Sequence, residues 1–141
     1  MGLFDIFKKK NGYKFNTDKK SPVKVEELEN FEKENNIKFP ELLRDYWFEY
    51  GDAPIKECNF EDKKYLTNLV HIFTPFHKDN AKIEGFIPQN FYAIAHDAGG
   101  NYFYWNAEDN KVYMAFDDDV DNPFVFFNSV EEMFKLMEKS I

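Results

Sequence analysis

Residues 101–116, NYFYWNAEDNKVYMAF, consist of two strand-like segments around a polar loop. Asn101–Trp105 and Lys111–Phe116 are rich in the aromatic and β-branched residues that favour strands. Between them lies Asn106–Asn110, a polar loop of the length that joins two antiparallel strands. The stretch therefore predicts a β-hairpin, and with it an antiparallel sheet in this half of the chain.

Further strand-like segments lie on both sides of the hairpin. Tyr65–Phe73 and Phe91–Ala95 precede it, Phe124–Phe127 follows it, and Ile83–Ile87 is a weaker candidate. The cluster His96–Gly100 is rich in turn residues and separates two of the expected strands. We expect a mainly antiparallel sheet of about five or six strands.

Two helices are predicted before the sheet. Ser21 as N-cap and Pro22 as first helical residue predict a helix over about residues 22–35, where apolar residues follow at helical spacing. A second helix is predicted over about residues 40–50 from one broad apolar stripe. Gly51 is a natural stop for this second helix.

A third helix is predicted at the C-terminal end. Ser129 and Glu132 have the spacing of a capping box, so a helix begins after the last strand. Its expected apolar face consists of Val130, Met133, Phe134 and Met137. Two helices, an antiparallel sheet and one further helix indicate an α+β fold.

Length and composition indicate one domain. The chain has 141 residues, 43% of them hydrophobic, which is enough to bury a core. Its formal net charge is −8, but residues 1–20 contain six Lys and two Asp, a net +4, so residues 21–141 carry −12. We expect a basic N-terminal arm and linker over residues 1–20 and the α+β domain over residues 21–141. Nucleic-acid binding is disfavoured because phosphate contacts need a basic face.

The sequence gives little evidence for membrane binding or for a reactive cysteine. Residues 1–10, MGLFDIFKKK, have the composition of a segment that lies on a membrane surface, but a short docked or frayed arm is the favoured interpretation. The apolar runs are far shorter than the roughly 18–20 residues that span a bilayer, so stable membrane insertion is not expected. Cys58 is the single cysteine and has no activating pattern around it, so we expect an ordinary thiol.

The acidic run after the hairpin matches the calcium-loop pattern only in part. Asp117, Asp119 and Asp121 occupy positions 1, 3 and 5 of an EF-hand loop, but Asn122 and Asn128 stand where Gly and Glu are required. A metal site is therefore not expected. Two interpretations remain for the run: a solvated loop, or a negative patch that faces a basic partner.

Motifs for catalysis are absent. The chain contains no GxSxG, Walker A or GxGxxG pattern and no clustered His/Cys spacing. His96-Asp97 resembles the metal-binding dipeptide of phosphohydrolases, but a strand-end His beside a turn Asp is favoured. We expect no catalytic residue, no metal and no cofactor, with a hydrolase as the least favoured hypothesis.

The first half of the chain carries part of a family pattern. A helix with an aromatic-Glu pair, Leu28–Glu32, leads through the apolar-Pro step Ile37–Pro40 to an aromatic helix segment, Tyr46–Phe48. The step Tyr50-Gly51-Asp52 departs from this pattern, which usually has an Asn-Gly-Gly-like sequence there.

The second half completes the resemblance. The turn Ile94–Asn101 reads IAHDAGGN, Val112-Tyr113 lies on the next strand, and Phe127–Ser129 leads into Phe134 of the last helix. In this order the pieces resemble the SUKH superfamily, the Smi/Knr-like fold, over about residues 23–137. The resemblance implies the α+β fold and the function of an immunity protein, which neutralises a cognate polymorphic toxin, often a nuclease, by binding it in the cytoplasm. Some eukaryotic relatives are regulatory interaction proteins, so a regulatory scaffold, peripheral to the membrane through residues 1–10, is the alternative.

The acidic body suggests which residues contact a basic toxin. Glu108, Asp109 and Asp117–Asp119 are expected to crowd one end of the sheet. The predicted partner-binding residues are Asp97, Glu108, Asp109, Asp117, Asp118, Asp119 and Asp121. The predicted structural turn residues are Gly99, Gly100 and Asn101, in which both glycines permit positive φ and Asp97 bonds the turn amides. For Asp97 the structural interpretation is favoured over direct contact.

Overall fold

The computed structural model describes residues 14–17, 19–60, 67–78, 80 and 87–140. Most of the expected basic arm, residues 1–13, lies outside the described residues, as does most of the weak strand candidate Ile83–Ile87.

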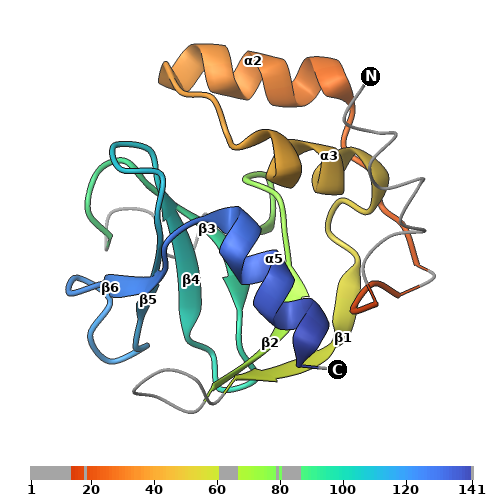
Figure 1. Cartoon of the computed structure of the whole chain (residues 1–141). Coiled ribbons are helices and arrows are strands. Elements are labelled where there is room, and N and C mark those ends of the chain that lie inside the picture. Colours follow the sequence, from red (N-terminus) through yellow and green to blue (C-terminus); the bar gives the residue numbers. More distant parts are fainter. Residues whose placement is uncertain (1–13, 18, 61–66, 79, 81–86, 141) are drawn as a thin grey trace.

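A six-stranded antiparallel sheet forms the centre of the fold (Figure 1). Its strands are β1 Pro54–Phe60, β2 Thr67–Ile72, β3 Phe91–His96, β4 Tyr102–Asn106, β5 Val112–Ala115 and β6 Phe124–Phe127. Each strand pairs with its neighbours in sequence, so the spatial order is β1-β2-β3-β4-β5-β6. Antiparallel neighbours can be joined by short connections, as between β3 and β4 and between β4 and β5. The predicted α+β class and the hairpin are confirmed.

Three helices accompany the sheet: α2 Val25–Asn35, α3 Glu41–Glu49 and α5 Val130–Lys139. Helix α5 packs against β1, β6 and α3, and Figure 1 shows it lying across one face of the sheet. Its N-cap is the predicted one, because the Ser129 side chain accepts a hydrogen bond from the Glu132 amide at 3.0 Å. The predicted apolar face is buried in full: Val130, Met133, Phe134 and Met137.

The beginning of α2 differs from the prediction. The helix begins at Val25, with Lys24 as N-cap and no side-chain cap, so Ser21 is not the N-cap and Pro22 is not helical. The Ser21 amide instead donates to the Tyr50 carbonyl oxygen at 3.0 Å, and the next paired amide, that of Val23, donates to α3 as well. These bonds hold the segment extended along the end of α3, so helix α2 begins about one turn later than predicted.

Gly51 ends α3 as predicted. Its φ is +59°, in the left-handed region that glycine adopts without strain. A Cβ at this position would lie 1.5 Å from the Ser21 carbonyl oxygen, so the crossing of the two chain segments also requires glycine. The same two residues, Ser21 and Gly51, form an isolated parallel bridge.

A buried glutamate fixes the connection between α2 and α3. The Glu32 carboxylate accepts a hydrogen bond from the Phe39 amide at 2.8 Å and pairs with the Arg44 guanidinium at 3.2 Å. Phe39 in turn packs its ring edge-on against Trp47, with ring centroids 4.9 Å apart. This connection is therefore a rigid wall of the domain, although it has no regular secondary structure.

Strand β1 was not predicted. Its burial alternates irregularly, because the pairing with β2 shifts register between Pro54 and Cys58. Charged residues also occupy its exposed positions, which hides the strand pattern in the sequence. The Cys58 thiol lies in the core, where burial raises its pKa to about 11, so it is an unreactive thiol at neutral pH.

Candidate partner-binding surface

The predicted acidic residues lie at two opposite ends of the sheet. Tyr102 pairs with Ala115 at one end of the β4–β5 ladder, and Trp105 pairs with Val112 at the other. Consecutive turns of an antiparallel meander lie at opposite ends, so the β4–β5 tip is separated from the β5–β6 loop. The expectation that Glu108 and Asp109 crowd together with Asp117–Asp119 is therefore wrong.

The carboxylate of Asp97 accepts hydrogen bonds from within its own β3–β4 turn. Asp97 is only 6% exposed, and its Oδ1 accepts a hydrogen bond from the Asn101 amide at 2.8 Å. Its Oδ2 accepts a second bond, from the Asn101 side-chain amide at 2.9 Å. Gly100 has a φ of +89°, as predicted, whereas Gly99 does not adopt positive φ. This geometry supports the structural interpretation of Asp97.

The β5–β6 loop lies at the same end of the sheet and presents its carboxylates to solvent. Its acidic residues are all exposed: Asp117, Asp118, Asp119 and Asp121. The Asp119 amide donates to the Phe116 carbonyl at 2.9 Å, and the Asn122 side chain donates to Asp119 Oδ1 at 2.7 Å. The Asp117 amide donates to Asn101 Oδ1 at 2.8 Å, which ties the loop to the neighbouring turn. Four carboxylates are thus held on an ordered loop.

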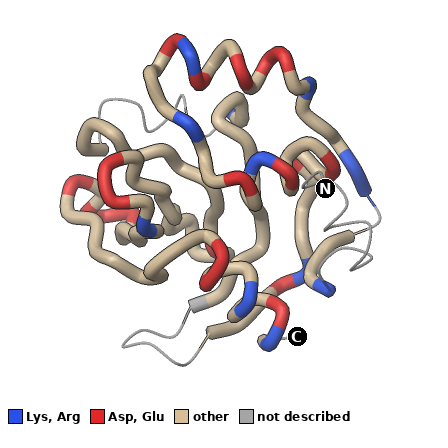
Figure 2. Tube along the Cα trace, turned by 45° about the horizontal axis from the view of Figure 1, so that its top comes forward, with Lys and Arg blue, Asp and Glu red and all other residues tan. Residues whose placement is uncertain are grey.

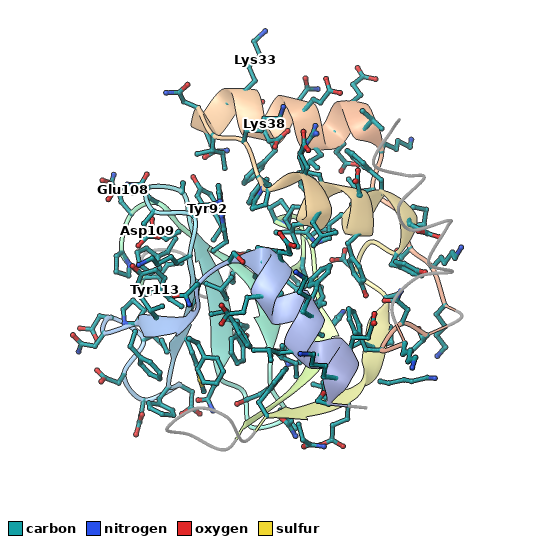
Figure 3. All side chains as sticks on the ribbon, in the orientation of Figure 1. Lys33, Lys38, Tyr92, Glu108, Asp109 and Tyr113 are labelled. Carbon is teal, nitrogen blue, oxygen red and sulfur yellow. The ribbon has the colours of Figure 1, made fainter. Side chains whose placement is uncertain are left out.

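The β4–β5 tip is also ordered by side chains. Glu108 Oε1 accepts a hydrogen bond from the Asn90 side-chain amide at 2.8 Å, and the Glu108 amide donates to Asn106 Oδ1 at 2.8 Å. The Tyr113 hydroxyl donates to Asp109, and this bond raises the pKa of Tyr113. Figure 3 shows the labelled Glu108, Asp109 and Tyr113 on this side of the molecule.

Three residues that organise the tip were missed in the sequence: Asn90, Asn106 and Tyr113. Asn106 and Asn90 are turn formers at strand ends, which is a weak signal. Asn90 has a φ of +69°, and its carbonyl accepts from the Ala107 amide at 2.8 Å. Because Asn90 and Glu108 are far apart in sequence, only the pairing of β3 with β4 brings them together.

The fold gathers the three histidines. The ring centroid of His71 lies 5.1 Å from that of His77 and 5.3 Å from that of His96. His71 Nε2 hydrogen-bonds to the Asp52 carbonyl, and burial lowers the pKa of His71. Within the described ranges, no group of three His, Cys, Asp or Glu side chains could hold a metal ion.

The dipeptide His96-Asp97 does not face a common ligand. His96 Nδ1 hydrogen-bonds to the Asp97 carbonyl at 2.9 Å, while the Asp97 carboxylate is bonded to Asn101. This arrangement favours a strand-end His beside a turn Asp over a hydrolase centre.

The described helices are too short or too polar to cross a membrane.

The model of the SMI1 / KNR4 family (SUKH-1) matches residues 22–136, more than four fifths of the chain. The chain belongs to the SMI1 / KNR4 family. The match includes the β3–β4 turn, the β4–β5 tip and the β5–β6 loop, so the acidic surfaces are part of the SUKH-1 domain. A comparison with curated proteins finds no match. Membership of SUKH-1 is consistent with an immunity role and with action by binding.

Proposed function

We propose that this protein is a non-enzymatic immunity protein that binds and neutralises a cognate, basic polymorphic toxin in the cytoplasm. The observation that carries the proposal is the density of carboxylates around β5 of a SUKH-1 domain. Residues 106–123 contain six acidic residues and one basic residue, Lys111. A nuclease toxin needs a basic surface to hold phosphates, and an acidic surface is the complement of that face.

One interface can cover both acidic turns, although they lie at opposite ends of the sheet. Strand β5, Val112–Ala115, separates them by about 13 Å at the usual rise per residue. A protein interface of standard size, about 800 Å² per partner, is about 30 Å across. Figure 2 shows acidic positions in turns on the side of the molecule that carries β5 and β6.

The ordered state of both turns favours binding. The Asn90 side chain holds Glu108 Oε1 at 2.8 Å, and the Asp117 amide ties the β5–β6 loop to Asn101 at 2.8 Å, so both segments are ordered before a partner binds and the loss of conformational entropy is smaller. Asp97 is left out of the proposed contact surface because it is only 6% exposed and both its carboxylate oxygens accept bonds from Asn101. We assign Asp97, Gly100 and Asn101 to the support of the loop.

The test begins with affinity capture of the tagged protein from its native cells, with elution in a salt gradient and identification by mass spectrometry. One stoichiometric basic protein, toxic when expressed alone and harmless when co-expressed with this chain, would support the proposal. A spread of cell-envelope or signalling proteins would favour the regulatory alternative instead. The part of that alternative that concerns residues 1–10 lies outside the described residues.

A matched pair of charge reversals tests the acidic surface on the captured toxin. Asp118→Lys/Asp121→Lys changes the β5–β6 loop, and Glu29→Lys/Glu34→Lys changes exposed positions of α2; both take the net charge from −8 to −4. We expect the loop variant to lose about 100-fold in affinity at low salt and the α2 variant to stay within about threefold. Equal losses in both variants would show a general charge effect and refute the assignment of the surface.

A further inference from the structure

Strand β6 forms one edge of the sheet, and its four residues, Phe124–Phe127, include no charged side chain. Figure 1 shows β6 and β1 at opposite margins of the sheet. Proteins usually protect an edge strand with charged side chains or with a covering segment, because an apolar edge invites contact with another chain. Strand β1 has both forms of protection, since Lys56 and Glu57 are exposed on it and Asn16 forms a β-bridge to Ile55. Strand β6 is therefore the less protected edge.

The apolar side chain that β6 exposes is Val125, which is 44% exposed. Its cross-strand partner on β5 is Tyr113, so the two side chains lie on the same face of the sheet. Tyr113 packs against the small cluster that contains the buried Tyr104, whereas α5 contributes to the main core on the other face. Val125 and Tyr113 therefore lie on the face of the sheet that α5 does not cover.

Tyr113 is held on two sides. Its ring centroid lies 4.8 Å from that of Phe91, and its hydroxyl donates to the Asp109 carboxylate. An aromatic ring fixed in this way loses little conformational entropy when a partner packs on it, and Tyr is enriched among the residues that dominate interfaces. The same bond places the Asp109 carboxylate next to this face.

Carboxylates stand at both ends of the Val125–Tyr113 pair. Asp109 lies on the β4–β5 tip, and the β5–β6 loop, with four exposed aspartates, leads directly into β6. The single basic residue in residues 106–123 is Lys111, against six acidic ones. An apolar centre inside a charged rim is the usual anatomy of a protein interface, and this rim is complementary to a basic partner.

We propose that the toxin binds this face of the sheet, with an apolar patch of the toxin on Val125 and Tyr113 and its basic residues against the flanking carboxylates. The inference rests on the proposed immunity function and identifies the contact face. A second copy of this chain is disfavoured as the occupant, because it would bring the same negative charges together.

The charge argument is tested first on the full chain alone, with two nitroxide probes of similar shape. The cation is aminomethyl-PROXYL and the anion is carboxy-PROXYL, and NMR relaxation enhancement of each backbone amide reports how often each probe approaches it. We expect the enhancement by the cation to exceed that by the anion about threefold at the Tyr113 and Val125 amides. Equal enhancements at these two amides would overturn the proposal.

The contact itself is tested with two matched valines and the captured toxin. Val25 on α2 is 45% exposed, so Val125→Lys and Val25→Lys change positions of equal exposure, and each takes the net charge from −8 to −7. We expect Val125→Lys to weaken toxin binding about 30-fold and Val25→Lys to stay within about threefold. Equal losses in the two variants would overturn the assignment of the face.

A smaller change separates the apolar contact from the charge and guards against misfolding. Val125→Ala should speed toxin dissociation about fivefold and leave the association rate unchanged, because apolar contacts act mainly on dissociation. Asp118→Lys/Asp121→Lys should instead slow association at low salt, since charges at the rim steer the encounter. An unchanged dissociation rate in a folded Val125→Ala chain would show that Val125 is not at the centre of the interface.

The outcomes separate this inference from the proposed function. If the toxin is captured and its rescue persists while both Val125 variants bind it as the native chain does, the inference fails and the immunity function stands. If no basic partner is captured, the immunity function fails and the inference falls with it. A dimer of this chain in analytical ultracentrifugation that Val125→Lys dissociates would show a second copy on β6, which overturns the inference and leaves the immunity function open to its own test.

Discussion

The β3–β4 turn and the β5–β6 loop lie side by side at one end of the sheet, and both are acidic, yet they use their carboxylates differently. Asp97 is buried and bonds the amide and side chain of Asn101. Asp118 and Asp121 are exposed on the neighbouring loop. An acidic residue in a turn is therefore available to a partner when its side chain stays exposed, as at Asp118 and Asp121, and unavailable when it is buried in bonds to its own turn, as at Asp97.

Removal of the Asp97 carboxylate should have the largest effect on stability. Asp97→Ala should lower the free energy of unfolding by about 3 kcal/mol, because it deletes two charge-assisted hydrogen bonds at a buried position. Asp118→Ala should change it by less than about 0.5 kcal/mol. Urea denaturation measures both, and similar values for the two variants would show that the turn and the loop do not differ in the proposed way.

Asn101 joins the two regions, so its removal should affect both. Asn101→Ala deletes the bond to Asp97 Oδ2 and the bond from the Asp117 amide, and we expect a loss of about 2 kcal/mol. The Asp117 amide should then exchange its hydrogen faster than in the native chain. Hydrogen exchange by NMR is the measurement, and unchanged protection of Asp117 would mean that the loop is ordered by its own turns alone.

Much of the fold could be predicted because local signals agreed with the final structure. Strands β3 to β6 combine aromatic residues with polar turns at their ends, and α5 has both its capping residue and its apolar face. Strand β1 was not predicted, because its register shift interrupts the alternation of buried and exposed residues. The beginning of α2 was wrong because tertiary bonds from Ser21 to α3 compete with a local cap.

The candidate surface was predicted in residue type but not in placement. Glu108 and Asp117 lie in consecutive turns of a meander, so their separation was implicit in the order of the strands. The contact of Asn90 with Glu108 could not be predicted, since it depends on the distance between β3 and the β4–β5 tip. Nor could the hollow that Ile37, Lys38 and Glu108 help to line, because it exists only where the α2–α3 connection passes beside the β4–β5 tip.

Asp45 is a second buried carboxylate, but unlike Asp97 it has an oxygen without a hydrogen-bond partner. It lies in α3, is 3% exposed, and its Oδ2 has no hydrogen-bond partner. Burial, with the nearby charge of Glu41, raises its pKa to about 6. Asp45→Asn should therefore stabilise the chain by about 1 to 2 kcal/mol at pH 7, where Asp97→Ala destabilises it.

The pH dependence checks the cause of the Asp45 effect. The folded state holds the Asp45 proton more tightly than the unfolded state, so this group favours folding below pH 4 and loses that contribution as pH rises through about 6. The gain from Asp45→Asn should be near zero at pH 4 and full at pH 7. Urea denaturation at the two pH values measures it, and a gain that does not vary with pH would point to packing instead of charge.

The smallest expected change in stability concerns the backbone conformation of the β3–β4 turn. Gly100→Ala should cost about 1 kcal/mol, because φ is +89° there and a Cβ opposes this conformation. Gly99→Ala is the matched control: its Cβ would meet Asp97 Oδ1 at 3.5 Å, an ordinary contact, and its φ is not positive, so the change should stay within about 0.5 kcal/mol of zero. If thermal unfolding ranks the two variants the other way, the turn is not held by the geometry that buries Asp97. Its carboxylate would then be open to a partner like those of the loop.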